Sequence, residues 1–164
     1  MAILEKVDKL HHAIAWKGSI PITSRYTVGI AGEQFFREIK EHARLLGTRC
    51  AACGLTYVPP TMFCERCFAP LDDWVEVAST GTVFTYTVLH LDLDEWPLAE
   101  PDILAYVRLD GSDGGLIHRL GEVDPDQVAI GMHVEAVFRP EGEREGSLLD
   151  IRYFRPMKND QLSI

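Results

Sequence analysis

The chain has 164 residues, of which 46% are hydrophobic and 25% are charged, and its formal net charge is −9. This composition is that of a soluble globular protein, and no run of eighteen or more apolar residues predicts a membrane span. The charge is uneven: residues 1–67 hold nine basic and six acidic side chains, whereas residues 68–164 hold seven basic and nineteen acidic ones. An acidic C-terminal part repels nucleic acids through its summed field.

The N-terminal residues predict two helices. The first has apolar residues on one face, at Ile3, Val7, Leu10 and Ile14. The second runs from Glu33 to Leu46, with Phe35 and Ile39 on its apolar stripe, and Gly47 is a typical C-terminal stop. Such helices either pack on their own domain or dock on another subunit, and the sequence leaves both interpretations open. We assign residues 1–47 to an N-terminal helical arm.

Four cysteines follow the second predicted helix. Cys50, Cys53, Cys64 and Cys67 form the pattern C-x2-C-x10-C-x2-C. Two residues between cysteines let both sulfurs of a tight turn reach one ion, and two such turns complete a tetrahedral shell. Gly54 suits the position after the first turn, where a positive φ is often required, whereas Phe68 takes that position in the second. We therefore expect a slightly different second turn, and we assign residues 48–71 to a zinc ribbon that holds structural Zn²⁺.

Three other readings of the cysteines stay open. Paired cysteines can be a redox dithiol, although one C-x2-C motif would suffice for that. Iron in a rubredoxin-like site uses the same four ligands as zinc. A catalytic zinc would need an open coordination position, which four cysteines do not leave. The N-terminus has no signal-peptide core, so we expect a cytoplasmic protein, in which spaced cysteines bind metal more often than they form disulfides.

From Asp72 onward the sequence predicts strands. Five runs rich in β-branched or aromatic residues lie at 82–91, 102–109, 116–120, 133–138 and 148–154. A glycine-rich turn at 111–115 predicts a hairpin, and Asp124 followed by Pro125 predicts a short helical turn between the third and fourth strands. Five strands in this order are typical of an OB-fold barrel. The fold class is thus mainly β with N-terminal helices, a rubredoxin-like zinc ribbon and an OB-fold domain over residues 72–164.

No catalytic motif was found in the sequence. The chain has no HExxH, no GxSxG, no phosphate-binding glycine loop and no Rossmann fingerprint, and its six histidines are scattered. An acidic loop at 92–95 is followed by Trp96, Pro97 and Leu98, which could expose apolar surface to a partner or ligand. We name no catalytic residue and no cofactor-binding residue, and we do not expect the chain to be catalytic alone.

The order of these parts resembles one known family. The segment from Phe35-Phe36 through Cys50-Ala-Ala-Cys53-Gly54 and Cys64-Glu-Arg-Cys67 to Gly81-Thr-Val-Phe-Thr-Tyr is similar to the zinc-ribbon/OB-fold family known as domain of unknown function 35. The resemblance covers about residues 33–156. A missing proline in Cys64-Glu-Arg-Cys67 departs mildly from the usual pattern.

The resemblance implies a function. Members of the family accompany thiolase-like condensing enzymes, in some cases acyl-CoA hydratases, and the partner supplies the catalytic residues. By this resemblance the four cysteines are metal ligands, and the chain is a non-catalytic subunit of a hetero-oligomeric acyl-CoA thiolase or acyltransferase complex that helps to accommodate coenzyme A or acyl-CoA. Two alternatives remain: an OB-fold nucleic-acid-binding protein, which the acidic charge disfavours, and a rubredoxin-like iron electron-transfer protein.

Overall fold

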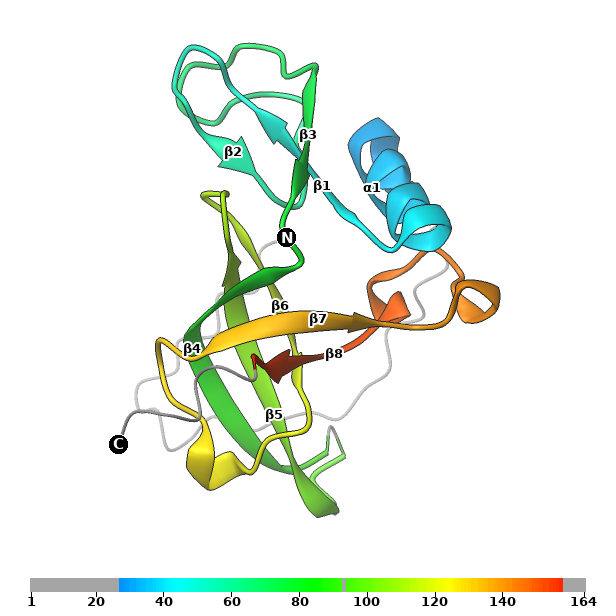
Figure 1. Cartoon of the computed structure of the whole chain (residues 1–164), viewed down its shortest axis with the longest axis vertical. Helices are drawn as coiled ribbons and strands as arrows, with labels where there is room; N and C mark the ends of the chain where they lie inside the picture. The colour runs from blue at the N-terminus through cyan, green and yellow to red at the C-terminus, as the bar shows by residue number, and fades with distance from the viewer. Residues whose placement is uncertain (1–26, 93, 158–164) are drawn as a thin grey trace, which may run out of the picture.

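A computed structural model describes residues 27–92 and 94–157 of the chain. A small three-stranded sheet stands on one end of a five-stranded barrel, and a single long helix lies beside both (Figure 1). The first predicted helix, over residues 3–14, lies outside the described residues. Within the described part, no helix has the length and apolar character needed to cross a membrane.

The helix α1 (Gly29–His42) begins and ends four residues before the predicted bounds. It ends at Ala43, which adopts a left-handed conformation with φ 52° and donates its N–H to the Ile39 carbonyl at 3.1 Å. Gly47, the predicted stop, instead lies inside a strand. A Cβ atom there would come within 2.6 Å of the Tyr57 carbonyl oxygen, so this glycine is needed for close strand packing.

The three-stranded sheet holds the cysteine segment. Its strands are β1 (Leu45–Arg49), β2 (Thr56–Tyr57) and β3 (Asp73–Val77). Their order is β2-β1-β3, and all pairs are antiparallel. The sheet therefore brings both ends of the cysteine segment back to the base of the ribbon, next to the barrel.

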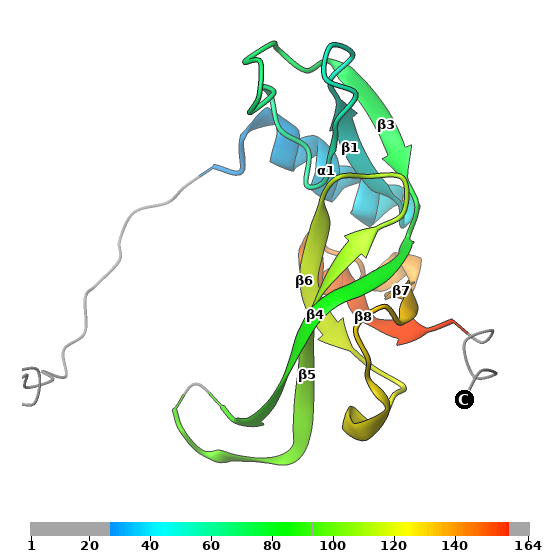
Figure 2. The same cartoon turned by 90° about the vertical axis from the view of Figure 1, so that its left-hand side faces the viewer.

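The remaining strands form a closed barrel in the order β4-β5-β6-β8-β7. They are β4 (Thr80–Leu91), β5 (Pro97–Leu109), β6 (Gly115–Leu120), β7 (His133–Phe138) and β8 (Ile151–Pro156). Beyond the barrel, β4 and β5 continue as a long hairpin (Figure 2). Trp96, near the tip of this hairpin, is 70% exposed, as its sequence context suggested.

The five predicted strands and the helical turn between the third and fourth are confirmed. That turn is η2 (Pro125–Gln127), and the Asp124 side chain accepts a hydrogen bond from the Asp126 N–H as its N-cap. The last predicted strand is divided. Its first residues form the short helix η4 (Leu148–Asp150), which a reciprocal cap between Ser147 and Asp150 stabilises. A further short helix, η3 (Glu141–Glu143), was not predicted.

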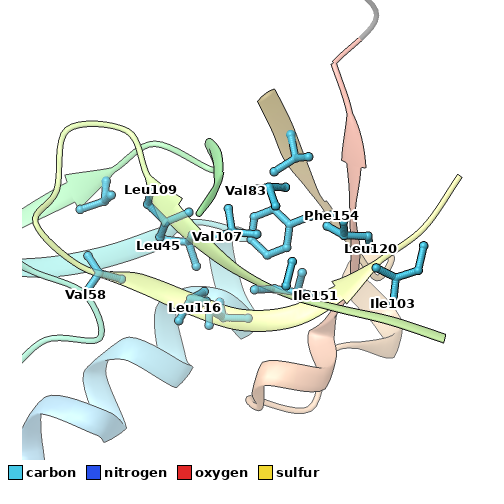
Figure 3. Close-up of a cluster of buried hydrophobic side chains, with 14 of the residues drawn as sticks. Leu45, Val58, Val83, Ile103, Val107, Leu109, Leu116, Leu120, Ile151 and Phe154 are labelled. Carbon is cyan, nitrogen blue, oxygen red and sulfur yellow. The ribbon is translucent and has the colours of Figure 1, made fainter. Parts of the chain in front are cut away.

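One hydrophobic core joins the helix, the base of the ribbon and the barrel. Phe35 and Ile39 of α1 are buried in it, with exposed fractions of 1% and 0%. Leu45 and Val58 of the ribbon lie close to barrel residues such as Leu116 (Figure 3). The described helix thus packs on its own chain, whereas the division at residues 47 and 71 stays a prediction.

Hydrogen bonds tie the ribbon to the turn between β5 and β6. The Thr56 N–H donates to Asp113 Oδ2 at 2.8 Å, and the Asp113 N–H donates to the Thr56 carbonyl at 2.9 Å. The Gly115 N–H donates to the Val58 carbonyl at 3.2 Å. A Cβ on Gly114 would lie 2.3 Å from that same carbonyl oxygen, so the turn can approach the ribbon only with glycine there.

Candidate metal centre

Two turns of the ribbon present the four cysteines, and the turns share one backbone pattern. In the first, the Gly54 N–H donates to the Cys50 carbonyl and the Cys50 N–H to the Leu55 carbonyl, both at 2.8 Å. In the second, the Phe68 N–H donates to the Cys64 carbonyl and the Cys64 N–H to the Ala69 carbonyl, both at 2.9 Å. Each turn points two sulfurs in one direction.

The expectation of a different second turn is wrong. Phe68 has φ 58°, close to the 70° of Gly54, so phenylalanine adopts the left-handed conformation that glycine takes in the first turn. This conformation is strained for a residue with a Cβ atom. The Phe68 side chain is 78% exposed, so little burial offsets the strain.

The four sulfurs converge on one point. All four Sγ atoms lie within 4.8 Å of one another, and Cys50 Sγ and Cys67 Sγ are 3.6 Å apart. A tetrahedral zinc with Zn–S bonds of about 2.3 Å requires sulfurs about 3.8 Å apart. None of the four is in a disulfide. The spacing therefore fits a tetrahedral cation with four thiolate ligands.

The electrostatics of the cluster also favour a cation. The hydrogen bond with Cys67, followed by burial, raises the pKa of the Cys53 thiol to about 12. Four thiolates at this distance repel one another, so they ionise together only if a positive ion lies between them. Cys50 and Cys64 are buried and Cys67 is exposed, so the ribbon surrounds the site on one side only.

Tyr57 contacts the cluster from β2. Its hydroxyl lies 3.2 Å from Cys64 Sγ and donates to that sulfur when it is a thiolate. This hydrogen bond lowers the pKa of the Cys64 thiol to about 6 and raises the pKa of the Tyr57 hydroxyl to about 12. Hydrogen bonds to the ligand atoms of a metal site orient them and tune their affinity. Sequence reasoning missed Tyr57, because its position opposite Cys64 depends on how the ribbon folds back.

A buried threonine fastens the loop between the two turns. Thr48 of β1 is fully buried, and its Oγ1 donates to the Thr61 carbonyl at 2.9 Å while accepting the Thr61 N–H at 3.0 Å. The pair holds the ten-residue spacer against β1. The two cysteine turns are thereby kept at the separation that a single ion needs.

The structure brings together all four cysteines named from the sequence. Within residues 27–92 and 94–157 they are the group of potential metal ligands that converges. His42, His90, His118 and His133 are not members of that group, and His11 and His12 lie outside the described residues. Four thiolates are enough for a tetrahedral shell without an open position, which is the arrangement of structural zinc sites.

A helix, a rubredoxin-like ribbon with four converging cysteines and an OB-fold barrel define a class of two-module metal-binding proteins. The model of the ChsH2 rubredoxin-like zinc ribbon domain matches residues 37–72, and that of the ChsH2 C-terminal OB-fold domain matches residues 74–139. The chain therefore belongs to the ChsH2-type DUF35 family of zinc-ribbon and OB-fold proteins, as the sequence resemblance indicated.

Proteins with similar sequences include members of the same family. The chain is 31% identical, over 76% of its length and 89% of the relative's, to a DUF35 domain-containing scaffold protein of Methanocaldococcus jannaschii. It is 37% identical to a "probable enoyl-CoA hydratase alpha subunit" of Thermomonospora curvata, over 61% of this chain but only 31% of that protein.

Two solved structures are similar. A DUF35-family protein of unknown function from Sulfolobus solfataricus has a TM-score of 0.57 and 31% identity, over 66% of this chain and 78% of that one. A chain of the Ltp2-ChsH2(DUF35) aldolase has a TM-score of 0.59 and 31% identity, over 80% of this chain and 98% of that one.

Proposed function

We propose that the chain is a zinc-binding companion subunit of a thiolase-type acyl-CoA enzyme. It stabilises the complex and helps to accommodate coenzyme A or acyl-CoA, while the partner carries the catalytic residues. The observation that carries this proposal is the similarity to the Ltp2-ChsH2(DUF35) aldolase, in which this chain matches 98% of one chain. The name of that aldolase joins a DUF35 protein to a second protein, Ltp2. The scaffold and enoyl-CoA hydratase relatives support it further.

The metal in this proposal is structural zinc held by Cys50, Cys53, Cys64 and Cys67. When bound, the ion supplies folding energy by joining the two cysteine turns, which share only a small apolar cluster with Leu71. Elemental analysis of purified protein should find about one zinc per chain. A red protein with visible absorption bands would instead indicate iron.

The partner role is tested by co-expression with a candidate thiolase-type protein. We expect one stable complex on size exclusion and thioester turnover only when both chains are present. A variant with Cys64→Ser and Cys67→Ser should lose the complex, whereas Arg108→Gln, on the outer face of the barrel, should keep it. Turnover by the isolated chain, or full activity of the partner without it, would contradict the proposal.

A further inference from the structure

The closed barrel has its shortest strand pairing between β6 and β8. Strands β6 and β8 run parallel, and a single residue pair, Leu120 with Phe154, connects them. A groove of about 680 Å³ is lined by residues from both strands. Residues 117–119 of β6, residues 151–153 of β8, the start of η4, Leu104 and Arg139 line it. Its volume is within the roughly 300–1,000 Å³ typical of small-molecule sites.

The groove is basic in an acidic part of the chain. Arg119, Arg139 and Arg152 line it, and no carboxylate is among its lining residues in the described structure. Residues 68–164 as a whole hold nineteen acidic and seven basic side chains. Three of those seven basic side chains therefore line one groove. This arrangement favours an anionic ligand.

The three guanidinium groups are not fully occupied by the protein. Arg119 Nη2 forms an ion pair with Asp102 at 2.5 Å, and the Arg119 side chain is still 61% exposed. The charge of Arg139 acts on Asp150, but that buried carboxylate already accepts backbone N–H groups from residues 145–147. Arg152 lies over the Tyr153 ring, 5.7 Å from its centroid. Each guanidinium has five N–H donors, so donors remain for a ligand.

Apolar side chains lie beside these arginines. Ile117 is 71% exposed and Leu149 is 68% exposed, and both line the groove together with Leu104 and Leu148. A ligand that covers these aliphatic side chains would gain free energy from the apolar area that it buries. The groove thus offers apolar contact next to its positive charge.

Hydrogen bonds and ring packing hold the groove wall in the absence of a ligand. The Arg119 N–H donates to His118 Nδ1 at 2.9 Å, so His118 Nε2 is the donor to the Leu148 carbonyl at 3.1 Å. The Tyr153 ring packs on Gly121, where a Cβ would lie 2.6 Å from the ring, and its hydroxyl donates to Glu122. A preformed wall lowers the entropy cost of binding.

We propose that this groove binds a phosphorylated small molecule with an apolar portion. Its phosphate oxygens contact Arg119, Arg139 and Arg152, since the planar guanidinium fork matches phosphate geometry. The apolar portion covers Ile117 and Leu149. This proposal rests on the proposed function, because that function is the reason for using an acyl-coenzyme A as the probe.

Calorimetric titration of the full zinc-loaded chain at fixed salt tests the groove. The probes are hexanoyl-coenzyme A, coenzyme A, ADP and hexanoate. We expect hexanoyl-coenzyme A to bind most tightly and hexanoate, which lacks phosphate, not to bind. Arg119→Gln with Arg152→Gln should weaken binding of coenzyme A at least about tenfold. Ile117→Ser should weaken only the acylated probe.

The matched control is Arg108→Gln, which removes an exposed arginine that lies over Phe84, outside the groove. It should leave every affinity unchanged, and all variants should keep the melting temperature of the unmodified chain. Equal losses in the control and the groove variants, or no binding of any phosphorylated probe, would overturn the inference. Complex formation with the partner is measured separately: a complex without phosphate binding refutes the groove alone, and phosphate binding without a complex refutes the proposed function.

Discussion

Gly54 and Phe68 occupy equivalent left-handed positions in the two cysteine turns, but only glycine does so without steric cost. We expect Phe68→Gly to raise the free energy of unfolding by about 0.5 kcal/mol, because relief of the strain exceeds the added flexibility of the unfolded chain. Gly54→Ala should lower it by about 1 kcal/mol. Thermal unfolding of the zinc-loaded variants measures both. A destabilised Phe68→Gly variant would show that the exposed ring makes contacts that offset its strain.

Tyr57 is the side chain whose hydroxyl donates to a cysteine sulfur. Tyr57→Phe removes this hydrogen bond and keeps the ring, so we expect a roughly 10- to 100-fold loss of zinc affinity. Competition with a chromogenic chelator measures the affinity. Tyr106→Phe, on the barrel, is the matched control and should bind zinc like the unmodified chain. An unchanged affinity in Tyr57→Phe would mean that the contact has no influence on the metal.

At the scale of elements, the loop from η3 to η4 is organised by one buried carboxylate. Asp150 is fully buried, which alone would raise its pKa, but hydrogen bonds from the Glu145, Gly146 and Ser147 N–H groups lower its pKa below the ordinary value of 3.8. A group whose pKa is lower in the folded state stabilises the fold above its ordinary pKa and loses that effect as the pH falls.

We therefore expect Asp150→Asn to lower the melting temperature at neutral pH and to flatten the decline of stability below about pH 4. Melting curves between pH 2.5 and 7 measure this. The control Glu141→Gln changes an exposed carboxyl of the neighbouring helix η3 and should follow the unmodified chain. If the melting temperature of Asp150→Asn fell below pH 4 as steeply as that of the unmodified chain, this pH dependence would not be due to Asp150.

The strands of the barrel could be predicted because β-branched and aromatic residues are concentrated in them and turn residues separate them. The end of α1 could not, since Leu45 and Leu46 continue the apolar spacing of the helix and yet belong to β1. The four cysteines were predicted from spacing alone. Arg119, Arg139 and Arg152 could not be grouped in that way. They lie on β6, directly after β7 and on β8, and only the barrel topology brings them to one groove.

In the whole molecule, the base of the ribbon shares its hydrophobic core with the barrel, and the cysteines form a separate small cluster next to it. Val58 lies between the two cysteine turns and is buried in the same cluster as Leu116 of β6. We expect calorimetry to show a single unfolding transition, and removal of zinc by a chelator to lower its midpoint, because the bound ion stabilises the folded state by mass action. Restoring zinc should restore the midpoint. Two separate transitions, of which only one responds to zinc, would contradict this expectation.

The hydrogen bonds between Thr56, Val58 and the turn at 113–115 have a geometric consequence. That turn is where β6 begins, and residues of β6 form one wall of the arginine-lined groove. A partner subunit that binds the ribbon would therefore also determine the orientation of the arginine-lined groove. Docking on the ribbon would in this way also set the orientation of a ligand bound in the groove, through these hydrogen bonds and the shared core.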